Sequence, residues 1–391
     1  MAFGRPMRAE WALDPEITYL NHGTVGAVPR RVLAAQQAIR DGVERRPSQF
    51  LLRDLSGLVG KPRDTPTLMR IAAGHVATFI GAREPDVVFV DNATTGVNAV
   101  LRSLPFDAGD ELLLTDHNYG ATARIAAFVA RERQARVVTV PVPYPAFDPN
   151  HLVDAIAGAI TSRTRVAVVD HITSETALIF PLNAIADACR SRGVAVLVDG
   201  AHAPGVLPLD VPALGVDWYV ANLHKWAHAP RSSGFLWAHP SRQAALHPAV
   251  ISWGLDQGFT AEFDWVGTRD PSPWLAAPQG LRFLNDLGYA DVRAYNHDLA
   301  WTAATLLCDR WGTTLGVRRD DIGAMVTLPL PARLGSTPAD AAQLRDGLLF
   351  DDWIEVQVHS GHGRLWTRVS AQIYNDRADL ERLGDAVASR V

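Results

Sequence analysis

Lysine is nearly absent from this chain: of its 37 lysine and arginine residues, all but Lys61 and Lys225 are arginine. A guanidinium stays protonated in proteins, whereas a partly buried ammonium can lose its proton and attack a carbonyl. Lys225 lies in the segment VANLHKW, while Lys61 lies in a polar segment flanked by proline. Lys225 is therefore the candidate nucleophilic amine, and the alternative is an ordinary solvated surface cation.

A candidate partner for this amine ends the apolar run VAVLVDGAH, which places Asp199 after a buried strand and His202 three residues later. A carboxylate there can keep a pyridinium nitrogen protonated, so that the ring becomes an electron sink, while a lysine carries the cofactor as a Schiff base. Asp199 could instead be the N-cap of a helix. Asp199 and Lys225 together indicate pyridoxal phosphate chemistry.

A phosphate site should accompany this pair, and the segment NATTGVNA supplies one directly after an apolar run. Thr94, Thr95 and Gly96 would open a helix there, and the free backbone N–H groups at a helix N-terminus bind phosphate. The same residues also make a good N-cap. Asn222 and His224, on either side of the candidate lysine, are further phosphate ligands to consider.

The cofactor ring also needs a partner against its face. The segment DHNYG follows another apolar run and offers an imidazole, His117, and a phenol, Tyr119. Either ring could stack on the cofactor, and either could be an ordinary loop contact. We prefer His117 and keep Tyr119 as the competing choice.

These residues need a sheet to position them. Short apolar and β-branched runs alternate with helical patterns between residues 68 and 240, which predicts an α/β fold with a mostly parallel sheet. The predicted strands are 87–90, 111–114, 137–140, 165–169, 194–198, 218–220 and 234–237. Open α/β sheets bind ligands beyond the carboxyl ends of their strands, where most of the candidate residues lie.

The pattern changes after about residue 270, where a smaller α+β region is expected. Its predicted helices are 276–285, 289–311 and 378–391, and its predicted strands are 324–330, 354–358 and 365–370. We expect a large domain over 21–269 and a small domain made of 1–20 and 270–391. The arginine-rich segment 40–67 is interpreted as helix and loop over the cleft or at a subunit contact.

The composition is that of an ordinary globular enzyme, with 48% hydrophobic residues, 20% charged residues and a formal net charge of −5. No basic block indicates nucleic-acid binding, and we expect a cytosolic protein because neither a secretory signal nor a membrane span is visible. Cys189 and Cys308 are isolated, so neither a disulfide framework nor a metal site is indicated.

At this point the chain resembles the class V aminotransferase family of fold type I pyridoxal phosphate enzymes, and within it the isopenicillin N epimerase-like branch. The segments that carry the resemblance, in chain order, are YLNHG, NATTGVNAVLRSL, DHNYGA, DHITSETALIFPL, VDGAHAPG, LHKW, GTRD and RVSAQIYN. The resemblance implies a mostly parallel seven-stranded sheet in a large domain, a smaller α+β domain, and pyridoxal 5'-phosphate as cofactor.

The resemblance also implies roles for the residues around the cofactor. Lys225 would be the Schiff-base lysine, Asp199 the partner of the pyridinium nitrogen, and His202 a contact of the 3-hydroxyl. Ser174 would lie near the same hydroxyl, and His117 would stack on the ring. Thr94 and Thr95 would hold the phosphate with help from Asn222 and His224.

Further implied roles concern the substrate and a second subunit. Thr268 would contact the phosphate bound by the neighbouring subunit, which implies a homodimer with shared active sites. Arg368 would bind the substrate α-carboxylate, a task that suits a bidentate guanidinium, although a surface salt bridge is the alternative. Asn21 and His22 would line the substrate pocket.

The chain departs from its relatives at two places. Cysteine desulfurases of the family need a nucleophilic cysteine before the carboxylate-binding arginine, but residues 357–364 read QVHSGHGR. Persulfide chemistry is therefore disfavoured, and Cys189 and Cys308 are expected to be small buried hydrophobes in helices. Glu175 is the second departure, an acidic residue where a small or cyclic one is expected.

The function we expect is that of a carbon–sulfur β-lyase, or a related reaction, on a bulky cysteine S-conjugate of specialised metabolism such as antibiotic biosynthesis. The alternatives are an amino-acid epimerase, a decarboxylation-linked oxidative deaminase of the same conjugates, and an aminotransferase. A DNA-binding regulator would need a basic module, and a nicotinamide dehydrogenase would need G-x-G-x-x-G, which the first strand lacks. The second acid or base is left open among His22, Tyr119, Glu175, His359 and His362.

Overall fold

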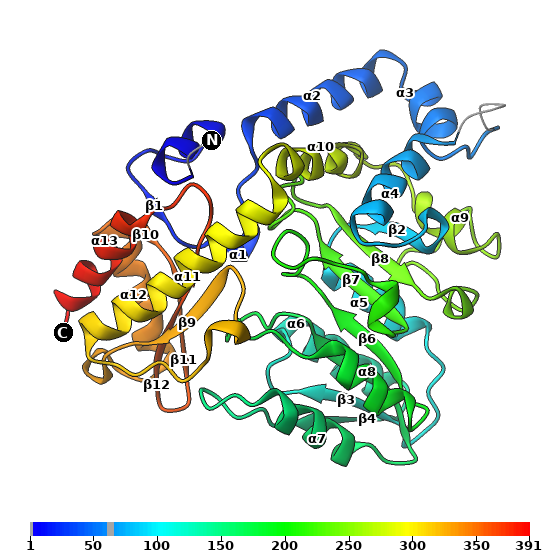
Figure 1. Ribbon diagram of the computed structural model, residues 1–391. Helices are drawn as coiled ribbons and strands as arrows, with labels where there is room; N and C mark the ends of the chain where they lie inside the picture. The colour runs from blue at the N-terminus through cyan, green and yellow to red at the C-terminus, as the bar shows by residue number, and fades with distance from the viewer. Residues whose placement is uncertain (1–2, 61–65) are drawn as a thin grey trace.

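The computed structural model describes residues 3–60 and 66–391, so that Lys61 lies outside the described residues. Its main feature is a seven-stranded sheet with the strand order β2-β8-β7-β6-β5-β3-β4 (Figure 1). The strands are β2 (Val87–Val90), β3 (Glu111–Thr115), β4 (Arg136–Val140), β5 (Thr164–Asp170), β6 (Ala195–Asp199), β7 (Trp218–Asn222) and β8 (Gly234–Ala238). All seven predicted strands are confirmed.

The strand directions bring the candidate segments to one edge of the sheet. Strands β4, β3, β5, β6 and β7 are parallel neighbours, whereas β8 runs antiparallel to both β7 and β2. The carboxyl ends of β2, β3, β5, β6 and β7 therefore meet at the same edge as the amino end of β8. The segments that follow these strands converge there.

Helices cover both faces of this sheet, which explains why its strands are apolar on both sides. One face packs against α5 (Ala93–Ser103) and α6 (Gly120–Glu132). The other packs against α4 (Leu68–Phe79), α7 (Pro149–Ala159), α8 (Leu182–Arg190) and α10 (Ser272–Asp286). Val88 and Val90 face the first layer, while Val87 and Phe89 face the second.

The remaining strands form a second, smaller region, to which the N-terminal arm contributes (Figure 1). It contains β1 (Thr18–Tyr19), β9 (Met325–Pro329), β10 (Ile354–Glu355), β11 (Gln357–Gly361), β12 (Arg364–Ser370), α11 (Tyr289–Trp311), α12 (Pro338–Phe350) and α13 (Arg377–Ala388). The single strand predicted over 354–358 is wrong. The chain changes partner at Val356, because β10 pairs with β1 and β11 pairs with β12.

Both cysteines lie where the sequence suggested. Cys189 is buried in α8 and Cys308 is buried in α11, and both are free thiols. Each packs within the larger hydrophobic core. The prediction that they are small buried hydrophobes is confirmed.

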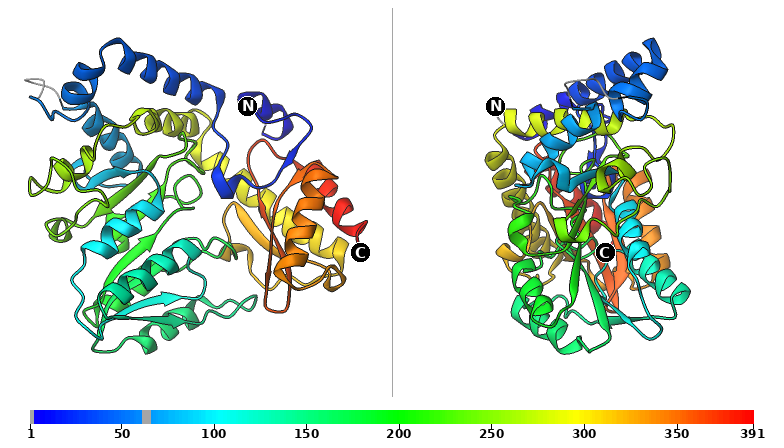
Figure 2. Two further views of the ribbon diagram at one scale, coloured as in Figure 1. Left: turned by 180° about the vertical axis from the view of Figure 1, so that it is seen from behind. Right: turned by 90° about the vertical axis from the view of Figure 1, so that its right-hand side faces the viewer.

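The segment between the arm and α4 lies along the outside of the large region. Helix α2 (Arg30–Arg45) packs beside α10 and leads into α3 (Pro47–Gln49) and the π-helical turn η2 (Phe50–Leu55) (Figure 2). The end of the segment predicted as helix and loop, residues 61–65, lies outside the described residues. That this segment covers the cleft or a subunit contact stays a prediction, as do the boundaries of the two domains.

The other helices are short. They are η1 (Arg5–Glu10), α1 (His22–Val25), η3 (Glu84–Asp86), η4 (Pro212–Leu214), η5 (Pro240–Arg242), α9 (Phe259–Asp264), η6 (Arg319–Asp321) and η7 (Ala332–Leu334). Among residues 3–60 and 66–391, no helix combines the length and the apolar character that a membrane crossing requires.

Candidate active site

Two cavities meet at the edge of the large sheet. We call the smaller one the inner cavity; its volume is about 300 Å³, and Lys225, Asp199 and His202 are in its wall. We call the larger one the outer cavity; its volume is about 730 Å³, and it extends from Lys225 and Arg368 to the β11–β12 hairpin. Thr24, Tyr119, Ser174 and Lys225 line both cavities.

Lys225 follows β7, and its amine is in an environment that favours the neutral form. Burial and, to a lesser degree, the guanidinium of Arg368 lower the pKa of Lys225, Asp199 and Asp170 oppose this effect, and the resulting pKa is about 7. The amine nitrogen lies 3.1 Å from Nε2 of His202. The lowered pKa favours the neutral amine far more than in an exposed lysine, as a nucleophile or base requires.

Two carboxyl groups lie together at the base of the inner cavity. Asp170 and Asp199 end the adjacent parallel strands β5 and β6 in register, and both are buried. Asp199 accepts hydrogen bonds from Thr122 Oγ1 at 3.0 Å and from the Ala201 N–H at 3.1 Å. Burial raises the pKa of both carboxyl groups, and the charge of Asp199 raises the pKa of Asp170 further.

Because two adjacent buried carboxylates repel each other, one proton should remain on the pair. The pKa of Asp170 is raised well above its usual value by burial and by the charge of Asp199. Asp170 also accepts a 2.6 Å hydrogen bond from Asn118 Nδ2. Both carboxyl groups line the inner cavity, and hydrogen bonds from Thr122 and Ala201 favour the ionised form of Asp199.

The opposite end of the inner cavity is formed by the start of α5. Asn222 Oδ1 accepts the N–H of Ala93 at 2.9 Å, and both residues line the cavity beside Thr94. His224 lines the same end, where its Nδ1 lies 3.1 Å from the carbonyl of Ser233. Thr94, Asn222 and His224 are therefore brought together as the sequence suggested.

Thr95, Gly96 and Thr268 are not brought to this cavity. The Thr95 side chain turns back to Asn92 at 3.2 Å, and Thr95 lines a separate apolar hollow beside Arg269. Gly96 packs against β7, where an added Cβ would lie 2.6 Å from Val220 Cγ1. Thr268 is exposed to solvent and does not line the inner cavity of its own chain.

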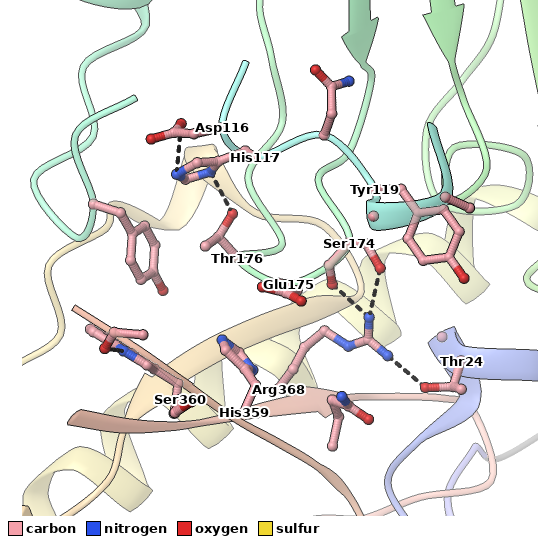
Figure 3. Close-up of a pocket in the computed structure, with 18 of the residues that line it drawn as sticks. Thr24, Asp116, His117, Tyr119, Ser174, Glu175, Thr176, His359, Ser360 and Arg368 are labelled. Atoms are coloured by element: carbon pink, nitrogen blue, oxygen red, sulfur yellow. Dashed lines mark hydrogen bonds and ion pairs between the residues drawn. The ribbon is translucent and has the colours of Figure 1, made fainter. Parts of the chain in front are cut away.

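Arg368, on β12, is the main cation of the outer cavity, and it is 3% exposed. Its guanidinium donates to the carbonyl of Ser174 at 2.6 Å and to Thr24 Oγ1 at 2.8 Å, while its Nε has no hydrogen-bond partner in the described structure (Figure 3). Burial lowers the pKa of Arg368 to about 10. Arg368 is therefore no surface salt bridge, and it retains unused capacity to bind an anion.

The two candidate stacking residues lie in different places. His117 faces the outer cavity, where its Nδ1 lies 2.9 Å from Thr176 Oγ1 and its Nε2 lies 3.9 Å from Asp116 (Figure 3). It is not in the wall of the inner cavity, whereas Tyr119 is. The geometry therefore disfavours His117 as the stacking residue, because its ring lines the outer cavity and not the inner one.

Asn21 and His22, which were expected to line the substrate pocket, are not among the residues that line the two cavities. His22 is fully buried behind the site; its Nε2 donates to the Lys225 carbonyl at 2.9 Å, and its Nδ1 accepts from the Tyr374 hydroxyl at 2.8 Å. Asn21 accepts a hydrogen bond from Thr24 Oγ1 at 2.6 Å. Both residues support the site from behind, and Thr24 is the residue of this segment that reaches the cavities.

The far wall of the outer cavity is aromatic and polar. The rings of Tyr144 and Trp366 have centroids 5.0 Å apart, and their polar tips bond the backbone carbonyls of Thr327 and Gly361. The ring of His362 lies 6.1 Å from that of Tyr144. Elsewhere the outer cavity is also lined by the polar residues Asp116, Arg124, Glu175, Gln357, His359 and Ser360.

Three residues of the site were missed in the sequence. Thr24 lies one residue beyond the segment YLNHG. Asp170 ends a strand, as Asp199 does, and that shared position was a signal. Arg231 precedes β8, whose amino end lies at the functional edge, and it lines the inner cavity with Ser232.

The inner cavity fits pyridoxal 5'-phosphate. It places an amine with a lowered pKa between a buried carboxylate at one end and hydroxyl, amide, imidazole and guanidinium donors at the other. An aldehyde, a ring nitrogen and a phosphate need these three kinds of partner. No group of histidine, cysteine, aspartate or glutamate in the described part of the chain could hold a metal ion.

Comparison with known sequences gives matches over nearly the whole chain. The sequence model of the family described as Aminotransferase class-V matches residues 61–383. An isopenicillin N epimerase of Streptomyces clavuligerus is 33% identical over 398 residues, which cover 97% of this chain and 96% of that protein. A probable chloroplastic L-cysteine desulfhydrase of Arabidopsis thaliana is 31% identical over 404 residues, which cover 96% and 83%.

Solved structures with the same fold include two of the protein C-DES. A mutant with glycine covalently linked to the PLP cofactor has a TM-score of 0.81 at 20% identity, covering 97% of this chain and 98% of that one. The complex of the cystine C–S lyase C-DES with its product cysteine persulfide has a TM-score of 0.80 at 21% identity, covering 98% and 99%.

Proposed function

We propose that this chain is a carbon–sulfur β-lyase. The premise is that it belongs to the class V aminotransferase family and is a pyridoxal phosphate-dependent enzyme of fold type I. Its substrate would be a cysteine that carries a bulky substituent on sulfur, as in specialised metabolism. The observation that carries this proposal is the outer cavity, which extends from Lys225 and Arg368 to a wall of aromatic and polar side chains.

The size of the outer cavity supports a substituted cysteine. Its volume of about 730 Å³ is in the range of roughly 300–1,000 Å³ that is typical of pockets for drug-sized ligands. The side chain of cysteine itself would leave most of this space to water. The hydroxyl of Tyr144 and the indole N–H of Trp366 both donate to backbone carbonyls, so their rings offer apolar surface to a substituent.

The charges of the outer cavity narrow the class of substituent. Once a substrate α-carboxylate offsets Arg368, the charged side chains that remain in the wall are the carboxylates Asp116 and Glu175 and the guanidinium Arg124. Burial lowers the pKa values of His117 and His359, so these rings are neutral at pH 7. Among these carboxylates and the guanidinium the balance is one negative charge, which favours a neutral or cationic substituent over an anionic one.

A desulfurase is disfavoured because Cys189 and Cys308, the two cysteines of the sequence, are buried in α8 and α11. Neither lines a cavity at the functional edge, so no thiol is in reach of the substrate sulfur. A β-lyase needs no such thiol.

The residues of the inner cavity would hold the cofactor. Lys225 would bind its aldehyde carbon, Asp199 its ring nitrogen, and Thr94, Asn222 and His224 its phosphate, with Arg231 as an added donor. His202 would contact its 3-hydroxyl near Ser174. Tyr119 replaces His117 as the proposed ring partner, because Tyr119 is the one of the two that lines the inner cavity.

The reaction then follows from the chemistry of the chain's own groups. When bound, pyridoxal phosphate withdraws electrons from the substrate α-carbon and so acidifies its hydrogen. Arg368 would hold the α-carboxylate, and the neutral amine of Lys225 would take the α-proton. The Cβ–S bond breaks, sulfur keeps the bonding pair and gains a proton, and uptake of one water gives a thiol, pyruvate and ammonia.

An amino-acid epimerase is the second candidate. An epimerase needs a second proton donor on the face opposite Lys225, and Tyr119 is an observed candidate because it borders both cavities and is 48% exposed. The similarity to an isopenicillin N epimerase agrees with this reading. His22 is no candidate, since both of its nitrogens are engaged behind the site.

Product analysis on the holoenzyme tests the proposal. S-benzylcysteine should give equal amounts of thiol, pyruvate and ammonia, faster than cysteine, and Lys225→Ala should give none. S-(2-aminoethyl)cysteine should be preferred to S-(carboxymethyl)cysteine by about tenfold, and Glu175→Gln should reduce that preference. Inversion of the α-carbon without these products would establish the epimerase instead, and release of carbon dioxide would indicate oxidative deamination.

The protein is further proposed to be a homodimer with shared sites. Val250, Ile251 and Trp253 expose 58%, 54% and 75% of their surface on one short segment, more than an isolated chain usually leaves open. Val250 lines the same apolar hollow as Arg269, next to Thr268. A second copy that covers this segment would receive Thr268 as a phosphate ligand.

A further inference from the structure

Two hydrogen bonds join Trp226, His202 and Lys225 in series. The indole Nε1–H of Trp226 donates to Nδ1 of His202 at 3.3 Å, and Nε2 of His202 lies 3.1 Å from the amine of Lys225. Trp226 and His202 are 1% and 2% exposed. Water therefore has little access to replace either partner.

The direction of both hydrogen bonds follows from which nitrogen atoms carry a proton and which have a free lone pair. An indole nitrogen can only donate, so Nδ1 of His202 must be an acceptor without a proton. Burial lowers the pKa of His202 well below its usual value, so its ring is neutral and carries its one proton on Nε2. Nε2–H then points at Lys225, and a contact between two donors is avoided only when Lys225 accepts as a neutral amine.

Packing against a second buried residue fixes the position of the Trp226 indole. The ring of Trp226 packs against that of His22 with centroids 4.9 Å apart. His22 itself donates to the backbone carbonyl of Lys225 and accepts from Tyr374. The side chain and the main chain of residues 225–226 are therefore fixed from two directions by one buried network.

We propose that Trp226 is a positioning residue that fixes the proton of His202 on Nε2, so that the imidazole meets Lys225 as a hydrogen-bond donor. The arrangement stabilises the free amine relative to the ammonium, which has no lone pair to accept Nε2–H. It also presents a donor to the place where the cofactor 3-oxygen is expected. This inference rests on the proposed function insofar as Lys225 is taken to be the reactive amine.

Substitution of the indole by an aromatic ring without N–H tests the proposal. In Trp226→Phe the imidazole can move its proton to Nδ1 and accept from a Lys225 ammonium, so the amine should become more basic. Arg368, Asp199, Asp170 and His224, the other charged or titratable groups around this pair, are unchanged. Trp237→Phe is the matched control, because Trp237 is equally buried and its Nε1 has no partner in the described structure.

The first readout is the reactivity of Lys225 in the full-length apoenzyme, and it does not depend on catalysis. Trace acetylation followed by mass spectrometry reports each lysine separately, and Lys61 serves as the reference for reagent dose. The midpoint of Lys225 reactivity should lie near pH 7 in the natural chain and about one pH unit higher in Trp226→Phe, a tenfold gain in proton affinity that one lost hydrogen bond supplies. An unchanged midpoint in a folded variant would overturn the proposal.

The second readout needs no variant at position 226. Selective ¹⁵N-histidine NMR of the natural chain, with the His202 signal assigned by its loss in His202→Gln, should show the proton on Nε2. A proton on Nδ1 overturns the proposal even if Trp226→Phe fails to fold. The proposed function fails separately, if Lys225→Ala still binds pyridoxal phosphate covalently, and that result would leave the assignment of the His202 proton intact.

Discussion

At the scale of single residues, the charge of Arg368 acts on the amine of Lys225. Arg368 is one of the causes that lower the pKa of Lys225. A carboxylate that binds Arg368 would offset this effect, so the amine would become a stronger base when a substrate is in place. The empty site thus favours a nucleophile that is free to react, and the filled site favours a base that can accept a proton.

The lowered pKa of Lys225 makes a prediction about pH. The ammonium form cannot attack an aldehyde, so capture of pyridoxal phosphate by the apoenzyme should rise with pH and level off above about 7, not near the usual lysine value of about 10.4. Below pH 7 the capture rate should fall about tenfold per pH unit. Stopped-flow absorbance between pH 5.5 and 9 measures this, and a rate that still climbs steeply between pH 8 and 9 would contradict it.

A second prediction concerns Arg368. Arg368→Lys keeps the charge but loses the planar fork of donors, so the KM for the amino-acid substrate should rise by about 10- to 100-fold. The kcat should change less, because Lys225 and Asp199 are retained. Arg364→Lys is the matched control, since Arg364 lies on the same strand and bonds the Leu330 carbonyl outside the cavities. Equal effects of the two substitutions would argue against a carboxylate site at Arg368.

At the scale of secondary-structure elements, the loop between β7 and β8 carries Lys225, and the turn after α1 supports it. Gly26, with a φ of +71°, approaches this loop so closely that a Cβ would lie 2.1 Å from the His224 carbonyl oxygen. His22, at the start of α1, bonds the Lys225 carbonyl. The N-terminal arm therefore helps to set the height of the reactive amine above the sheet.

Gly26→Ala tests this support. The substitution combines an unfavourable φ with a collision against backbone, so we expect a loss of about 1–3 kcal/mol in unfolding free energy together with weaker cofactor capture. Gly193→Ala separates the two effects, because Gly193 has the same φ of +71° but open space around its Cβ. Denaturant unfolding of both variants measures the difference; if they lose stability equally and both capture the cofactor normally, the contact with His224 has no role.

The elements of the large sheet could be predicted because each strand is a short apolar run between helical patterns. The split of 354–358 could not, because Ile354, Val356 and Val358 alternate as in one continuous strand and are all buried. The change of partner there depends on Thr18 and Tyr19, more than three hundred residues earlier in the chain. A pairing over that distance leaves no mark in the local sequence.

The site residues that follow the carboxyl ends of strands could be predicted from the sequence. Lys225, Asp199, Asn222 and Thr94 come to one cavity because parallel strands share an edge. The sequence could not show from which side a neighbouring residue approaches, so His22 was expected in front of Lys225 and lies behind it. His117 and Tyr119 are two residues apart on one loop and both line the outer cavity, but only Tyr119 also reaches the inner cavity.

At the scale of the whole molecule, the packing of a single chain does not explain why the apolar side chains of residues 250–253 are exposed. Trp253 is 75% exposed and Val250 is 58% exposed, although burial of such side chains is favourable. Thr268, the residue proposed to reach the neighbouring phosphate, is exposed as well. A second copy of the chain would account for both observations at once.

Trp253→Glu should therefore separate the subunits without unfolding them, because a charge in an apolar interface loses its hydration. Light scattering should give the mass of one 42.5 kDa chain where the natural protein gives twice that mass. Pyridoxal phosphate affinity should fall by about tenfold or more, since a phosphate ligand from the partner is lost. Phe350→Glu is the control, because Phe350 is 72% exposed on α12 and should change neither quantity; a Trp253→Glu protein that stays dimeric would remove this segment from the interface.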